Sequence, residues 1–103
     1  MKLPYRTRDP RSFRDIAEQL LRGRVDCGSY MLDCSMWRSA DVEYVDRRVY
    51  DRLSGLRLRL RIPVLRLRGD SGECKIEARW DGEWFRLECR DVEKCCRRVT
   101  RGP

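Results

Sequence analysis

The chain has no histidine and no asparagine, Gln19 is its single amide side chain, and only three of its 24 basic residues are lysine. Without histidine, nucleophiles activated by an imidazole base are excluded, and so are metal sites built on imidazole. Loss of heat-labile amides is typical of proteins from hot environments, so we expect a hyperthermophile source. A GC-rich genome would also favour arginine over lysine.

Long apolar runs are missing as well. No stretch approaches the ~20 residues of a membrane-spanning helix, and the N-terminal MKLPYRTRDPR lacks the apolar segment of a secretory signal. We therefore expect no membrane partner and a cytoplasmic location. The 103 residues suit a single domain, 1–103, and hydrophobic residues at 41% supply a core. The net charge of +7 favours acidic partners.

Three segments have the pattern of helices. In DPRSFRDIAEQLLRG, Asp9 can cap, Pro10 suits the first helical position and Gly23 follows the last turn, which predicts a helix over 10–22. A second helix is expected over 39–53, with Ser39 as its cap and Val42, Val45, Val49 and Leu53 on its inner face. A short third helix, capped by Asp91, is expected in the tail DVEKCCRRVTRGP.

Two further segments read as strands. SYMLDCSMW, residues 29–37, is rich in aromatic and apolar residues and too short for a helix. LRLRLRIPVLRLRG, residues 56–69, alternates leucine with arginine, but its phase changes at Pro63. A proline at a phase change predicts a bulge or bend and an edge position for that part of the strand.

The segment CKIEARWDGEWFRLEC, residues 74–89, is expected to be a hairpin around a two-residue Asp81-Gly82 turn. In that register Trp80 faces Glu83, and Cys74 lies opposite Cys89. Apolar pairs then occupy one face, while opposite charges and an arginine beside Trp84 occupy the other.

These elements predict an α+β fold of order α-β-α-β-β-β-α. A four-stranded, mainly antiparallel sheet carries helices on one face, and its opposite, exposed face is rich in arginine. The side chains expected on that face are Arg57, Arg59, Arg61, Arg66, Arg79, Trp84 and Arg86.

Six cysteines remain to be placed. The facing of Cys74 and Cys89 makes a disulfide plausible, and Cys27 with Cys34 is a candidate for a second one. The alternative is buried free thiols. No C-x₂-C pair is present, and adjacent Cys95 and Cys96 suit tetrahedral zinc poorly, so we expect no metal and no cofactor.

One catalytic hypothesis can be built from GDSGECK. Its Asp70, Glu73 and Lys75 resemble the two carboxylates and lysine of the PD-(D/E)xK nucleases, which hold Mg²⁺ and steady the attacking water. In that family the first aspartate lies on a separate upstream strand, whereas Asp70 lies in the same turn. Turn residues and a solvated charge pair explain these three residues more simply.

The arginine-rich face is the better basis for a function. Arginine clamps phosphates, and Trp84 offers a platform on which bases can stack. We therefore expect a small non-catalytic protein that binds the backbone of nucleic acid, preferably single-stranded DNA or RNA. The alternative is a structural or protein-interaction module, of which a homodimer is one form, because an exposed sheet face must be polar whatever it binds.

Overall fold

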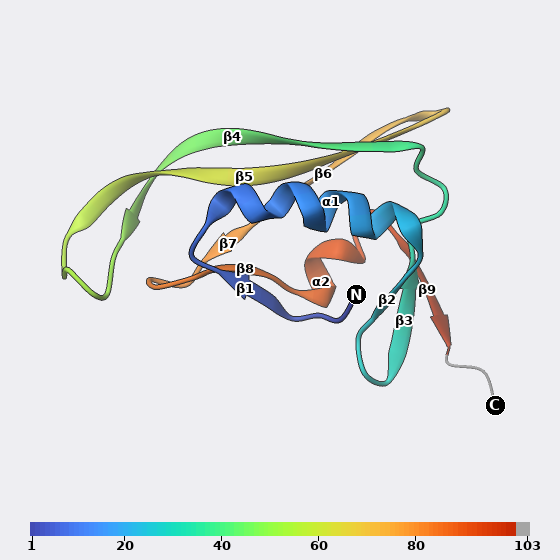
Figure 1. Ribbon diagram of the computed structural model, residues 1–103, viewed down its shortest axis with the longest axis horizontal. Helices are drawn as coiled ribbons and strands as arrows, with labels where there is room; N and C mark the ends of the chain where they lie inside the picture. Colours follow the sequence, from blue (N-terminus) through green and yellow to red (C-terminus); the bar gives the residue numbers. More distant parts are fainter. Residues whose placement is uncertain (101–103) are drawn as a thin grey trace.

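The computed structural model describes residues 1–100, whose strands form three separate antiparallel sheets (Figure 1). The elements are β1 (Tyr5–Thr7), η1 (Pro10–Ser12), α1 (Phe13–Arg22), β2 (Arg24–Asp26), β3 (Tyr30–Asp33), β4 (Ser39–Tyr50), β5 (Arg57–Gly69), β6 (Gly72–Glu77), β7 (Arg79–Trp80), β8 (Phe85–Leu87), α2 (Cys89–Val92) and β9 (Arg97–Thr100). The sheets have the orders β4-β5-β6, β2-β3-β9 and β1-β8-β7. The expected mixture of helices and antiparallel strands is confirmed, but the predicted element order and the single four-stranded sheet are wrong.

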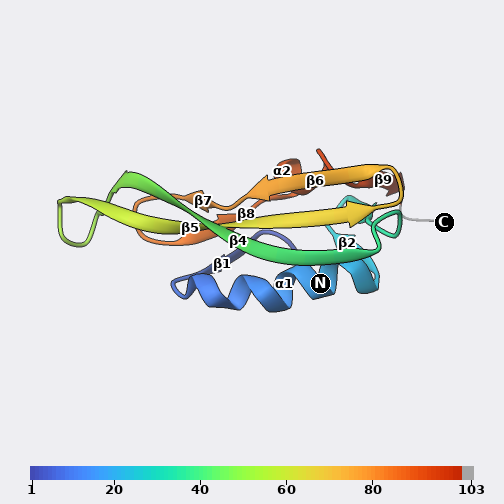
Figure 2. The same ribbon diagram turned by 90° about the horizontal axis from the view of Figure 1, so that it is seen from above.

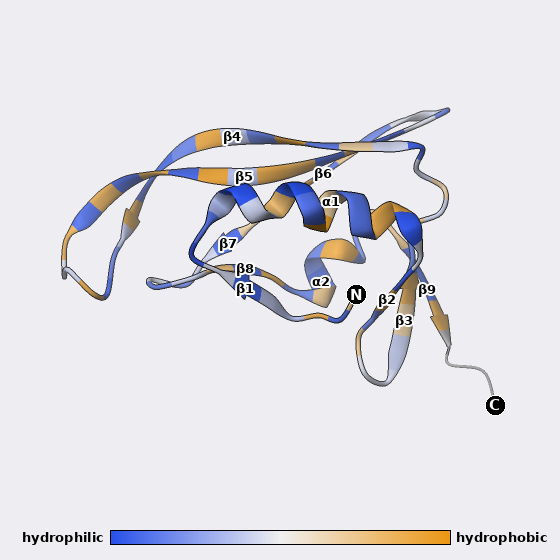
Figure 3. Cartoon of the chain, viewed as in Figure 1, coloured by the Kyte–Doolittle hydropathy of each residue, from blue (hydrophilic) through white to orange (hydrophobic). Residues whose placement is uncertain are grey.

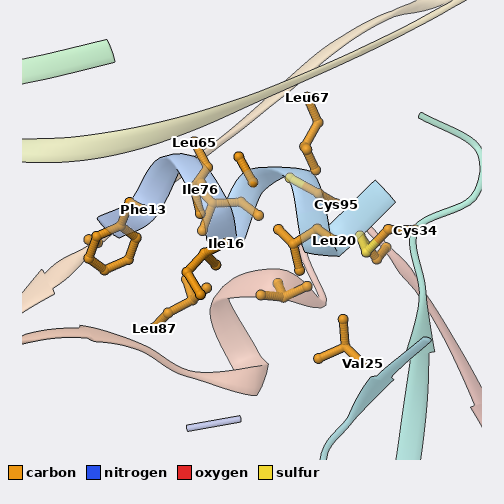
Figure 4. Close-up of a cluster of buried hydrophobic side chains, with 14 of the residues drawn as sticks. Phe13, Ile16, Leu20, Val25, Cys34, Leu65, Leu67, Ile76, Leu87 and Cys95 are labelled. Atoms are coloured by element: carbon orange, nitrogen blue, oxygen red, sulfur yellow. A yellow bond between two sulfur atoms is a disulfide. The ribbon is translucent and has the colours of Figure 1, made fainter. Parts of the chain in front are cut away.

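The first helix forms where the sequence predicts it. The Asp9 carboxylate accepts a hydrogen bond from the backbone N–H of Arg11 at 3.0 Å, and Pro10 opens a single 3₁₀ turn that leads into α1. The apolar face of α1 is buried and consists of Phe13, Ile16, Ala17 and Leu20. Figure 4 shows Phe13, Ile16 and Leu20 of this face together with Leu65, Leu67 and Leu87 in one core.

The predicted second helix is wrong, because residues 39–50 form the long strand β4. This strand pairs with β5 without interruption, from Ser39 opposite Arg68 to Tyr50 opposite Arg57. Its β-branched and aromatic residues suit a strand. Ala40, Val42 and Tyr44 occupy even positions, whereas Val45 and Val49 occupy odd positions. This one-residue shift of the apolar pattern places Val42, Val45 and Val49 three and four residues apart, which is the spacing of a helix.

The same change of phase occurs in β5, directly opposite. Pro63 pairs with Tyr44, and the register continues unbroken on both sides, so the predicted bulge is wrong. Pro63 is also not at an edge, because its carbonyl accepts the N–H of Ala78 on the other side of β5. Side chains alternate between the faces of an unbroken strand. Arg57, Arg59 and Arg61 therefore share a face with Leu65 and Leu67, while Arg66 and Arg68 lie on the opposite face.

The core accordingly lies on different sides of this sheet along its length. Leu65 and Leu67 point into the cluster around α1 (Figure 4). Ile62, on the other face, lines a cavity with Val49, Ala78 and Trp80. Figure 3 shows the alternating hydropathy along β4 and β5. The phase change in the alternation of leucine and arginine along β5 is therefore explained by a sheet whose buried face changes at Pro63.

The predicted hairpin over 74–89 exists in part and in another register. Trp80 pairs with Phe85, so the loop has four residues rather than two. The Asp81 carboxylate accepts the backbone N–H groups of Glu83 and Trp84, which closes this longer turn. Upstream of Ala78 the chain leaves β8 and pairs with β5 as β6. The predicted facing of Cys74 and Cys89 therefore does not occur.

The strand predicted over 29–37 is confirmed as β3, but it pairs with β2 and β9 in a separate sheet. The predicted tail helix, capped by Asp91, is wrong over most of its length: the single helical turn α2 begins at Cys89 and ends at Val92. Its cap is Glu88, and the Asp91 carboxylate accepts the Glu88 N–H in a capping box. Beyond it the chain turns into β9, so Val99 lies on a strand.

All six cysteines form disulfides, in pairs that differ from the predicted ones: Cys27–Cys89, Cys34–Cys96 and Cys74–Cys95. The pairings Cys74–Cys89 and Cys27–Cys34 are wrong. Adjacent Cys95 and Cys96 bond in two directions, to β6 and to the residue after β3. The segment 89–96 therefore joins two of the sheets covalently.

Candidate nucleic-acid interface

The basic side chains on one face of β4, β5 and β6 are paired with acidic ones. Arg66 Nε lies 3.1 Å from Asp41, Lys75 Nζ 2.9 Å from Glu43, and Arg47 Nη2 2.9 Å from Glu77. Arg68 contacts Asp41 and Glu73 at longer range. The hydrogen bond from Lys75 lowers the pKa of Glu43 despite its partial burial. This ion-pair face, made of Arg47, Arg66, Arg68, Lys75, Asp41, Glu43, Glu73 and Glu77, carries no net charge.

Three more residues of the predicted face are also engaged. Arg79 binds the Asp91 carboxylate, with Nη2 at 2.7 Å. Arg86 contacts Glu88 at 3.1 Å and Asp81 at 3.5 Å. The ring of Trp84 is covered by the guanidinium groups of Arg6 and Arg8, whose Cζ atoms lie 4.9 and 4.5 Å from its centroid. Both guanidinium groups and the Trp84 ring therefore already have partners within the protein.

Arg57, Arg59 and Arg61 differ from these residues. They lie on the part of β5 beyond the end of β6, where β4 and β5 form a two-stranded arm over residues 44–63. Together with Arg48 they form the arm arginines, all four of them exposed. Within residues 1–100 none of the arm arginines has a carboxylate oxygen within 4.0 Å of its guanidinium nitrogens.

The placement of Arg48 makes this arrangement unusual. It pairs directly with Arg59 across the two strands. Like charges at directly opposed positions destabilise a sheet, so the fold itself gains nothing from this pair. Sequence reasoning missed Arg48 because residues 39–53 read as a helix. The change of apolar phase between Tyr44 and Val45 is the signal that could have identified it.

The arm is held in place from its other face. The Trp80 indole N–H donates to the Tyr50 carbonyl at 2.8 Å, and the Arg52 N–H donates to the Gly82 carbonyl at 2.7 Å. The turn at its end is closed by Asp51, which accepts from Ser54 and Gly55, and Gly55 adopts the left-handed conformation with φ 72°. These hydrogen bonds fix the backbone of the arm, whose two strands extend beyond β6 in Figure 2.

At the root of the arm the basic surface continues onto α1. Arg61 and Tyr44 line a cavity of about 260 Å³ with Pro10, Arg11 and Arg14. The Arg61 Cζ lies 5.3 Å from the centre of the Tyr44 ring. Arg11 is paired with Asp9, and its hydrogen bonds lower the pKa of that carboxyl. Arg14 has no carboxylate partner within the described part of the chain.

The residues of the nuclease hypothesis are in three different ion pairs. Asp70 contacts Arg38 at 3.0 Å, Glu73 contacts Arg68, and Lys75 contacts Glu43. Among residues 1–100 there is no group of three or more acidic or cysteine side chains placed to hold a metal ion. The structure therefore lends the nuclease hypothesis no support.

No protein-family model, curated protein or solved structure gives a significant match to this chain. Within residues 1–100 neither helix is long and apolar enough to cross a bilayer. The arm arginines are therefore the basis on which a function has to be argued.

Proposed function

We propose that this protein binds nucleic acid without catalysis and that its contact surface is the arm. The observation that carries the proposal is the set of four exposed arginines on one face of a supported hairpin, with Arg48 directly opposite Arg59. Within residues 1–100 none of the four is in an ion pair, although Asp46 lies directly opposite Arg61. A polyanion relieves the repulsion that this arrangement creates. Planar guanidinium groups also match the geometry of phosphate oxygens.

The refined surface retains Arg57, Arg59 and Arg61 from the sequence-based prediction and adds Arg48. It leaves out Arg66, Arg79 and Arg86, because binding a phosphate there would require breaking an ion pair. It also leaves out Trp84, whose ring is already covered. The contacts proposed are therefore made by arginine guanidinium groups, without stacking of bases on Trp84.

The test is a binding titration at several salt concentrations. If the four arm arginines neutralise four phosphates, log K should fall with log salt with a slope of about −3 on a single strand and about −3.6 on a duplex. Affinity that does not depend on salt, or no binding at all, contradicts the proposal.

Matched variants test the surface itself. Replacing Arg57, Arg59 and Arg61 by Gln should weaken binding at least tenfold and reduce the steepness of the salt slope by about 2 to 3. The control replaces Arg22, Arg24 and Arg90 by Gln, which removes the same charge from exposed positions outside the arm. If both triple variants lose affinity equally, net charge rather than the arm is responsible.

The second candidate is a protein-interaction module. The observation that favours it is the apolar end of the arm, where Tyr50, Leu53 and Leu56 are 56%, 64% and 60% exposed. Exposed apolar groups of this kind mark contact sites when they cluster. Light scattering over a dilution series separates the two candidates, because a homodimer requires a species heavier than 12.4 kDa in the absence of nucleic acid.

The proposed location remains the cytoplasm of an organism from a hot environment. Disulfides are rare in the cytosol of mesophiles but occur inside hyperthermophiles, which fits three bridges in a chain without asparagine. An oxidising compartment outside the cytoplasm would also preserve these bridges. Fractionation of the source cells, with an antibody against the protein, distinguishes the two locations.

A further inference from the structure

The exposed aromatic rings that could stack on unpaired bases are largely occupied. Arginine guanidinium groups lie over Trp84, Tyr44 and Tyr30, the last with Arg98 Cζ 3.7 Å from the ring centre. The indole N–H groups of Trp37 and Trp80 donate to backbone carbonyls, and Tyr50 remains as the exposed ring on the arm. Proteins that bind single strands depend on several such rings in succession.

The arm instead has the shape of an element that binds in a groove of duplex DNA. From Tyr44 opposite Pro63 to Tyr50 opposite Arg57 it consists of two antiparallel strands. At about 3.3 Å per residue this ribbon is roughly 20 Å long. The major groove of B-form DNA, about 12 Å wide and 8.5 Å deep, admits a two-stranded ribbon. The molecule measures 47 × 30 × 19 Å, and the arm lies at one end of its long axis (Figure 1).

The spacing of the arginines fits the same partner. Arg57, Arg59 and Arg61 are alternate residues of one strand, so their Cα atoms are about 6.6 to 6.8 Å apart. Successive nucleotides of one DNA strand are about 3.4 Å apart along the helix axis, so two steps match one arginine interval. Arginine is also the side chain that most often contacts the O6 and N7 atoms of guanine in the major groove.

The two faces of the ribbon have distinct surroundings. The face opposite the arm arginines carries Val49 and Ile62, which lie near Ala78 and Trp80. The arginine face is exposed at Arg48, Arg57 and Arg59. At its root, Arg61 is bordered by Arg14 of α1 and also lines a cavity with Trp80 and Phe85. A duplex can therefore approach the outer part of this face, while Trp80 and Gly82 hold the arm through hydrogen bonds to its backbone.

We infer that the arm enters the major groove of duplex DNA, with its arginine face toward the base pairs. This inference rests on the proposed nucleic-acid-binding function and names the class of nucleic acid. A-form RNA duplexes have the same strand charge, but their major groove is too deep and narrow for side chains to read. The comparison between duplex DNA and duplex RNA therefore separates groove entry from simple attraction to phosphates.

The experiment measures the affinity of the full chain for a 20-base-pair DNA duplex, the RNA duplex of the same sequence and the single DNA strand, all at one salt concentration. Fluorescence anisotropy should show the DNA duplex bound at least tenfold more tightly than the RNA duplex. Equal affinity for the two duplexes, or tighter binding of the single strand, overturns groove entry but leaves the proposed function intact. No binding to any of the three overturns both.

A chemical footprint provides the second readout. Dimethyl sulfate methylates guanine N7 in the major groove and adenine N3 in the minor groove. Bound protein should protect guanine N7 over part of the duplex and leave adenine N3 reactive. The variant with Gln at 57, 59 and 61 should lose this protection, whereas the variant with Gln at 22, 24 and 90 should keep it. Binding with unprotected N7 atoms contradicts the inference.

Discussion

Arg61 and Arg66 belong to the same strand, yet their side chains lie on opposite faces of the sheet, and only Arg66 has carboxylate partners. Arg66 contacts Asp41 and Glu43 and is one-quarter exposed, whereas Arg61 is exposed and lies over the Tyr44 ring. Because their surroundings differ, we expect Arg66 to contribute to stability and Arg61 to the proposed binding.

This difference predicts opposite outcomes for two equivalent substitutions. Arg66→Gln should lower the free energy of unfolding by about 1 kcal/mol, because two charge-assisted contacts in a network are lost. Arg61→Gln should change it by less than about 0.5 kcal/mol and should weaken nucleic-acid binding. Urea denaturation and anisotropy titration of both variants measure the two effects. A destabilised Arg61 variant with normal binding contradicts the assignment.

Because Arg48 lies opposite Arg59, replacing Arg48 by an acidic residue should raise the stability of the fold and weaken nucleic-acid binding. Arg48→Glu replaces a like-charge pair by an opposite-charge pair, so the free energy of unfolding should rise by about 0.5 kcal/mol at low salt. The same change should weaken nucleic-acid binding at least tenfold. In 1 M salt the gain in stability should largely disappear. A stability gain that persists unchanged at high salt would show that the effect is not electrostatic.

The arrangement of the disulfides predicts how much stability each cysteine variant loses. Cys27 and Cys34 are seven residues apart, as are Cys89 and Cys96, so their two bridges join the same pair of segments. Replacing Cys27 and Cys89 by Ser leaves the second bridge in place and opens a loop of about 15 residues, at a loss of about 3 kcal/mol. Replacing all four should cost several kcal/mol more. Guanidinium denaturation of the two variants measures the difference.

A thiol count on the unreduced, denatured protein checks the bridges themselves. The expected number of reactive thiols is zero, because all six cysteines are bonded. Reduction before denaturation should expose all of them. Six free thiols in protein isolated without reductant would falsify the pairing described here.

The surroundings of Asp91 predict that the fold loses stability at acid pH. Its side chain is buried, which by itself raises its pKa, but hydrogen bonds from Arg79 and from the Glu88 N–H, together with the Arg79 charge, hold the pKa below its usual value. A carboxyl group with a lowered folded pKa stabilises the fold above its unfolded pKa of about 3.9. This contribution is lost as the pH falls through the folded pKa.

Asp91→Asn should therefore be less stable than the parent protein by about 2 kcal/mol at pH 7, the scale of lost hydrogen bonds to a charged group. The difference should shrink as the pH falls below about 4. The control is Asp70→Asn, at an exposed carboxylate paired with Arg38, for which we expect less than about 0.5 kcal/mol at either pH. Urea midpoints between pH 7 and pH 2 test both. A constant difference across that range would exclude an ionic role for Asp91.

Local signals in the sequence predicted the elements that depend on local chemistry. The Asp9-Pro10 start and the apolar face from Phe13 to Leu20 gave α1 correctly. The alternation of leucine and arginine likewise gave β5. Both patterns are properties of short segments, and tertiary contacts did not override them.

Some of the wrong predictions involve partners distant in sequence, and others involve local contacts that compete with the expected ones. Val42, Val45 and Val49 have the spacing of a helix because the buried face changes sides at Tyr44, and the pairing with β5 explains this change. The Asp81-Gly82 dipeptide favoured a two-residue turn, but the Asp81 carboxylate stabilises a longer one. Four of the seven residues predicted for the interface have partners that the sequence analysis did not assign to them: Arg66, Arg79 and Arg86 are in ion pairs, and arginines lie over Trp84.

Every disulfide takes one of its cysteines from the segment 89–96. During synthesis on the ribosome, Cys27, Cys34 and Cys74 therefore emerge before any of their native partners. An oxidant that acts in that interval can join them only to one another, in pairs such as Cys27 with Cys34. Native pairing has to follow translation of Cys89, Cys95 and Cys96, so correct oxidation of this chain depends on delayed bond formation or on an isomerase that corrects early pairs.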